Sequence, residues 1–118
     1  MLSFHANLKV FVATAAWDLR ANFNGLWNAA QTQLGEDPKS GALFVFGNRR
    51  HNRIKILYFD GTGVCILTKR LEEGTFHMPR SAGEPSAKIR LAPQALQLLL
   101  DGVDLKEGAR RAWYECAS

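Results

Sequence analysis

The chain has 118 residues, of which 47% are hydrophobic and 22% charged, and no apolar run is long enough to cross a bilayer. These values are typical of one soluble domain and exclude a membrane-spanning chain. The formal net charge of +4 permits an acidic partner without requiring one. Cys65 and Cys116 lack the close paired spacing of a zinc site or a disulfide framework, so we expect reduced thiols and a hydrophobic core without metal.

The first half of the chain predicts one strand and one helix. Residues 9–14 are mostly β-branched and aromatic, which favours a strand. Asp18 is a suitable N-cap for a helix that ends by Gly35 to Pro38. The apolar positions of this helix recur every three or four residues and share one face; they are Phe23, Leu26, Trp27, Ala30 and Leu34.

Three strands in series follow, at residues 43–46, 54–59 and 64–71. The last two are joined by Asp60-Gly61-Thr62-Gly63, which suits a tight hairpin because Asp and Gly tolerate positive φ. The first two are joined by residues 47–52, which are rich in turn formers. The simplest topology is an antiparallel meander.

The remaining elements are shorter. Thr75–Met78 is predicted as a short edge strand and Lys88–Leu91 as another strand, while Pro93 can begin a helix that runs toward Gly102. The tail from about residue 105 is charged, and we expect it to be mobile. The fold class is therefore α+β: an antiparallel meander sheet of four or five strands with an N-terminal and a C-terminal helix packed on it, in a single domain over residues 1–118. The N-terminus lacks a signal-peptide pattern, which predicts a cytoplasmic protein.

The basic charge is concentrated in the predicted hairpin and the turn before it. This segment contains six basic residues and one acid, Asp60, so its net charge is +5 and that of the rest of the chain is −1. The six are Arg49, Arg50, Arg53, Lys55, Lys69 and Arg70. Lys and Arg on adjacent strands can neutralise phosphates, which makes this segment the candidate nucleic-acid site. The alternative is that these charges only solvate an exposed sheet face.

No catalytic, metal or cofactor site is predicted. A two-metal nuclease needs converging carboxylates, but each candidate acid has a structural position in a cap, a turn or a helix end. These acids are Asp18, Asp37, Asp60, Asp101 and Asp104. His5, His51 and His77 are too far apart for a metal-binding motif.

Tryptophan supplies a large contact area, and the chain has three. Trp27 shares the predicted helix face with Leu34 and is expected in the core. Trp17, before the helix, and Trp113 with Tyr114, in the tail, are the candidate residues for contact with a protein partner.

A series of short motifs runs in order along residues 8 to 105. They are Phe11–Thr14, Asp18–Leu26, Asp37–Phe46, Asn48–Arg50, Arg53–Tyr58, Asp60–Gly61, Lys69–Glu72 and Leu98–Asp104. Their order and spacing resemble those of the TnpB-type accessory proteins, products of the second reading frame of the IS66 group of bacterial insertion sequences. In that family the second motif usually reads D-M-R-K-G-F-D-G-L.

This chain departs from the family pattern at several positions. Ala21 and Asn22 replace Lys-Gly, Asn24 replaces Asp, and Phe59 and Met78 stand where Trp is common. No role of those positions in the family is therefore carried over to this chain.

The resemblance implies a non-catalytic protein that is encoded beside a separate transposase and assists movement of the element; it is not the RNA-guided nuclease of the same name. One hypothesis is an accessory factor that binds the element-end DNA, with low sequence specificity, through the basic hairpin. A second is an adaptor that docks on the transposase and never contacts DNA, with an acidic patch on that partner facing the hairpin. A third, a small metal-dependent nuclease, is disfavoured by the positions of the acids. We expect a monomer in isolation, because charges on an edge strand oppose pairing.

Overall fold

The computed structural model describes residues 8–79 and 86–104. The elements in chain order are β1 (Val10–Ala13), α1 (Phe23–Asn28), the π-helical turn η1 (Ala29–Gln33), the 3-10 turn η2 (Pro38–Ser40), β2 (Leu43–Gly47), β3 (Arg53–Phe59), β4 (Val64–Arg70), β5 (Lys88–Leu91) and α2 (Pro93–Leu100). The predicted strands at the start of the chain and at residues 88–91 are confirmed, as is the helix that begins at Pro93.

The described residues form one five-stranded sheet in the order β4-β3-β2-β1-β5. Strands β2, β3 and β4 are the predicted antiparallel meander, and β5 pairs antiparallel with β1. Strand β1, however, pairs parallel with β2, so the purely antiparallel sheet predicted from the sequence is wrong and the sheet is mixed. The reason is that α1 and η1 form a crossover between β1 and β2, which returns the chain to the end where β1 began.

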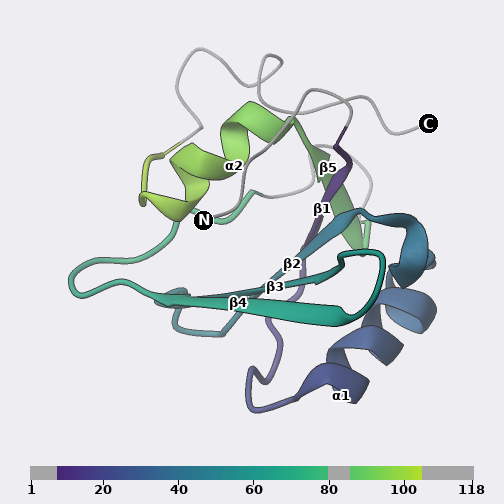
Figure 1. Cartoon of the computed structure of the whole chain (residues 1–118). Helices are drawn as coiled ribbons and strands as arrows, with labels where there is room; N and C mark the ends of the chain where they lie inside the picture. The colour runs from purple at the N-terminus through teal and green to yellow at the C-terminus, as the bar shows by residue number, and fades with distance from the viewer. Residues whose placement is uncertain (1–7, 80–85, 105–118) are drawn as a thin grey trace.

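Apolar side chains cover both faces of the sheet, because successive side chains along a strand point to opposite sides. On one face Val12 and Ile56 pack with Leu96 of α2. On the other face Phe44 and Leu57 pack with Leu26 of α1. Figure 1 shows the sheet between the two helices, with α2 above it and α1 below.

The first helix begins later than predicted. Asp18 is not its N-cap: α1 starts at Phe23 after Asn22, whose side chain makes no capping hydrogen bond. The Asp18 carboxylate instead accepts a hydrogen bond from the backbone N–H of Arg20, and the Ala21 N–H donates to the Asp18 carbonyl in a turn. Because the helix starts at Phe23, that ring lies at the helix end and is 44% exposed rather than buried.

The edge strand predicted at Thr75–Met78 is also wrong. Phe76 is 1% exposed, and its N–H donates to the carbonyl of His51 in the β2–β3 turn. The N–H of Leu71 donates in the same way to the Asn52 carbonyl. This segment therefore packs against the turn between two strands instead of pairing along a sheet edge.

In the part of the chain that the structure describes, no helix has the length and apolar character needed to cross a membrane. The predicted mobile tail from residue 105 lies outside the described residues.

Candidate nucleic-acid interface

The turn between β2 and β3 holds Arg49 and Arg50 at its tip, and the side chain of Asn48 fixes its shape. The Asn48 Oδ1 atom accepts hydrogen bonds from the backbone N–H groups of Asn52 and Arg53, each at 3.1 Å. The Asn48 amide nitrogen donates to Asn52 Oδ1 at 2.7 Å. The two arginines therefore project from a turn whose backbone is held at both ends.

Strand pairing brings a further arginine to this end of the sheet. Arg53 of β3 lies directly opposite Arg70 of β4, so their side chains leave the same face of the sheet. Like charges in directly opposite positions destabilise a sheet. Within residues 8–79 and 86–104, neither guanidinium has a carboxylate at ion-pair distance. An anion from outside the described chain would remove this repulsion.

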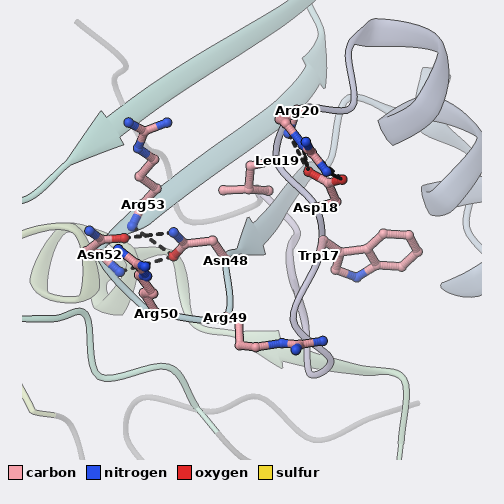
Figure 2. Close-up of a pocket in the computed structure, with 9 residues that line it drawn as sticks. All are labelled: Trp17, Asp18, Leu19, Arg20, Asn48, Arg49, Arg50, Asn52 and Arg53. Carbon is pink, nitrogen blue, oxygen red and sulfur yellow. Dashed lines mark hydrogen bonds and ion pairs between the residues drawn. The ribbon is translucent and has the colours of Figure 1, made fainter.

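A cavity of about 360 Å³ lies beside the turn, and we call it the arginine pocket. The residues that line it are Trp17, Asp18, Leu19, Arg20, Asn48, Arg49, Arg50, Asn52 and Arg53. Figure 2 shows the four arginine side chains spread around Leu19 and Asn48.

The loop before α1 forms the other wall of the arginine pocket. The backbone N–H of Trp17 donates to the Gly47 carbonyl at 2.9 Å, and the Trp17 ring packs edge-on against Phe46 at a centroid distance of 5.6 Å. Leu19 is buried, at 8% exposure. These contacts hold the loop, and with it Arg20, against the end of β2.

Asp18 is the only acid among the described residues that line the pocket. It pairs with Arg20 through both carboxylate oxygens, at 2.8 Å for the Nη2–Oδ2 contact. The hydrogen bond from the Arg20 side chain lowers the pKa of Asp18 to about 2, and the same contact raises the pKa of Arg20. Arg20 is thus partly neutralised, whereas Arg49, Arg50 and Arg53 have no ion pair with any described residue.

The predicted basic site is only partly gathered in one place. Arg49, Arg50 and Arg53 line the arginine pocket and Arg70 lies next to Arg53. Lys69 does not join them: it sits opposite Ile54, on the other face of the sheet, with its Nζ atom 3.8 Å from a carboxylate oxygen of Asp101.

Lys55 is half-buried, and its ammonium donates to the Ala21 carbonyl at 3.4 Å. It therefore fastens the loop before α1 to the sheet.

Arg20 was not predicted as a site residue, because it lies far from the β2–β3 turn along the chain and no local sequence pattern indicates that the fold brings the two together. Trp17 lines the pocket, whereas Trp113 and Tyr114 lie outside the described residues.

Two acids of the described residues, Asp60 and Asp37, hold the backbone of turns. Asp60 accepts hydrogen bonds from the backbone N–H groups of Thr62 and Gly63, both at 2.9 Å, and these bonds lower its pKa to about 2. Asp37 accepts from the N–H of Lys39 at the start of η2. Their predicted roles in turns are confirmed. The described ranges contain no group of three His, Cys, Asp or Glu residues that could hold a metal ion.

Comparison with known proteins identifies the chain. The profile of the family described as IS66 Orf2 like protein matches residues 8–110. Two uncharacterized proteins of Sinorhizobium fredii, y4hO and y4jC, are 38% and 34% identical to the chain over 104 residues, covering 88% of this chain and 88% and 86% of their own lengths. No solved structure matches it significantly. The resemblance noted in the motifs is confirmed: the chain belongs to the IS66 Orf2-like family, and with it to the proteins of insertion-sequence transposition.

Proposed function

We propose that this protein is a non-catalytic accessory factor of an insertion-sequence transposition system, and that it binds the phosphate backbone of DNA through the arginine pocket and the adjacent Arg70. Family membership supports the link to transposition. The observation that carries the DNA-binding part is the pair Arg53 and Arg70, placed face to face without a described acid to neutralise them.

Arginine suits this task because its planar guanidinium can hold a phosphate through two parallel hydrogen bonds. The arginine pocket offers such groups on a turn whose backbone is fixed by Asn48. A fixed backbone loses little conformational entropy when an anion binds, which favours affinity for a polyanion.

The binding should depend little on base sequence. Helix α1 is six residues long, and its exposed polar residues Asn24 and Asn28 carry no charge. This is unlike a basic recognition helix that enters the major groove. Contacts confined to phosphates give orientation and salt-dependent affinity but no direct sequence readout.

The test is binding of the full chain to a labelled element-end duplex and to an unrelated duplex, measured by fluorescence anisotropy over a range of salt concentrations. The variant Arg53→Ala/Arg70→Ala should bind both duplexes about tenfold more weakly or worse at low salt. The slope of log affinity against log salt is negative, and each neutralised phosphate steepens it by about 0.9, so the magnitude of the slope should fall by about 1.8 in this variant.

The matched control is Lys9→Ala/Lys69→Ala, which removes the same charge elsewhere. The Lys9 carbonyl accepts a hydrogen bond from the Leu43 N–H, at the end of β2 opposite the turn, and Lys69 leaves the other face of the sheet. This control should keep most of the affinity. If both double variants lost the same affinity for DNA, the loss would be due to the lower net charge and not to the position of Arg53 and Arg70. A folded native chain that binds neither duplex at low salt would overturn DNA binding and leave the transposase as the direct partner.

A further inference from the structure

A second hollow, of about 300 Å³, lies at the far end of β3, and we call it the aromatic pocket. The residues that line it are Phe23, Asn24, Trp27, Lys39, Phe59 and Val64. Trp27 meets Phe59 edge-on at a centroid distance of 6.3 Å and an angle of 76°. Phe23 stays 44% exposed at the start of α1. Three aromatic rings of the described lining are thus grouped around an open hollow instead of closing it.

The two pockets share one face of the sheet. Arg53 and Phe59 are six residues apart on β3, an even number, so both side chains leave the face on which α1 packs. At about 3.3 Å per residue, the two positions are about 20 Å apart.

The loop that leads into α1 connects the two pockets directly. Arg20 lines the arginine pocket, and Phe23 and Asn24, three and four residues later, line the aromatic pocket. Between them, Lys55 holds the Ala21 carbonyl and so keeps this connection on the sheet. The two pockets are therefore linked by the short segment between Arg20 and Phe23.

The charge of the aromatic pocket decides which occupant it fits. Lys39 is the only charged residue of its described lining, and no acid is among them. A hollow that combines aromatic faces with a cation suits unpaired nucleic-acid bases, which stack on rings while the backbone phosphates stay near positive charge. Bases of an intact duplex are stacked on one another and cannot offer their faces in this way.

We infer that the aromatic pocket stacks unpaired bases of a single-stranded nucleic acid whose phosphates lie on the arginine pocket. This inference rests on the proposed function and adds the substrate class: a strand with accessible bases, bound in preference to a closed duplex. Sequence preference should stay weak, because every base has a face that can stack.

The experiment compares two labelled strands of about ten nucleotides: oligothymidylate, and an abasic strand with the same phosphates and no bases. Binding of the full chain is measured by anisotropy at low salt. Phe23→Ala should weaken binding of oligothymidylate about fivefold or more, which is the scale of one base stacked on one ring. The same variant should leave binding of the abasic strand unchanged, because the phosphates still meet the arginines.

Leu67→Ala is the matched control, since Leu67 is also an exposed large apolar residue, at 40%, but lies opposite Ile56 on the other face of the sheet. It should bind both strands like the native chain. Circular dichroism and the melting temperature establish that each variant is folded.

The outcomes separate the two proposals. If the native chain binds the abasic strand and a duplex but Phe23→Ala binds oligothymidylate as tightly as the native chain does, base stacking is overturned and phosphate binding stands. If the native chain binds oligothymidylate no more tightly than the abasic strand, the inference also fails. If the folded native chain binds neither strand nor duplex, the proposed function fails with it, and the aromatic pocket becomes a candidate surface for a protein.

Discussion

At the scale of single residues, the arginine pocket contains an acid among its described lining. Asp18 holds Arg20 through both carboxylate oxygens at the wall of the pocket. A phosphate that approaches the pocket meets the negative charge of Asp18 and competes with it for the same guanidinium. Asp18 would therefore oppose the proposed binding of phosphates by the surrounding arginines.

Asp18→Asn should raise the affinity for DNA. The change removes one negative charge and frees Arg20 for a phosphate, so we expect affinity at low salt to rise by up to about fivefold. The slope of log affinity against log salt should become more negative by up to about 0.9, because one more phosphate is neutralised. Anisotropy titrations of the native and variant chains measure both quantities, and an affinity that falls instead would mean that Asp18 positions Arg20 for binding.

Single residues also show which parts of the candidate site could not be predicted from the sequence. The basic segment predicted a phosphate site, which stays a prediction, and the structure brings its residues Arg49, Arg50 and Arg53 to one pocket. Which face a residue takes depends on the hairpin register, however, and one position separates Arg70, beside Arg53, from Lys69 on the opposite face. Arg20 reaches the pocket only through tertiary packing, which no local pattern encodes.

At the scale of elements, the hairpin between β3 and β4 was the most predictable part of the fold. Its turn needs residues that tolerate positive φ, and Gly61 has φ +105°. The parallel pairing of β1 with β2 was not predictable, because the strand pattern reports burial and not the direction of the neighbouring strand. The late start of the first helix was not predictable either, because an Asp suits a turn, such as the one that Asp18 forms with Arg20 and Ala21, as well as it suits an N-cap.

The hairpin turn predicts a pH dependence of stability. Because hydrogen bonds from Thr62 and Gly63 lower the pKa of Asp60 to about 2, its charged form stabilises the folded state above the unfolded pKa of about 3.9. That contribution is lost as the pH falls toward 2. The melting temperature of Asp60→Asn should therefore lie below that of the native chain at pH 7, and the gap should narrow between about pH 4 and pH 2.

Asp18 titrates in the same range in both chains, so its effect cancels in this difference. A gap of constant size from pH 7 to pH 2 would show that the charge of Asp60 does not stabilise the turn.

At the scale of the whole molecule, the sheet ties two cores into one unit. Neighbouring residues of the same strand belong to different cores: Ile56 packs on the side of α2 and Leu57 on the side of α1. Lys88 of β5 adds a further link, since its ammonium donates to the Leu34 carbonyl at the end of η1 and pairs with Glu36. If either helix left the sheet, the strands would lose the packing on one face, and the same strands carry the core residues of the other face.

Unfolding should therefore be a single transition whichever core is damaged. Leu26→Ala on the α1 side and Leu96→Ala on the α2 side remove side chains that are 0% exposed, and each should lower the free energy of unfolding by about 2–5 kcal/mol. Far-ultraviolet circular dichroism and tryptophan fluorescence should give coincident midpoints in both variants.

Exposed Leu67→Ala should change the free energy of unfolding by no more than about 0.5 kcal/mol. Separate midpoints for the two probes in Leu96→Ala would contradict this coupling, because they would show the α1 side surviving alone.

The opposition of Arg53 and Arg70 has a consequence for how the protein responds to its surroundings. Folding brings these two charges together, so an anion bound between them, as proposed, would also stabilise the folded chain. By mass action, a ligand that binds only the folded chain raises the melting temperature as its concentration increases. The melting temperature of the protein therefore reports how much anion is bound. Unlabelled polyanions can be ranked by the increase in melting temperature that each one causes.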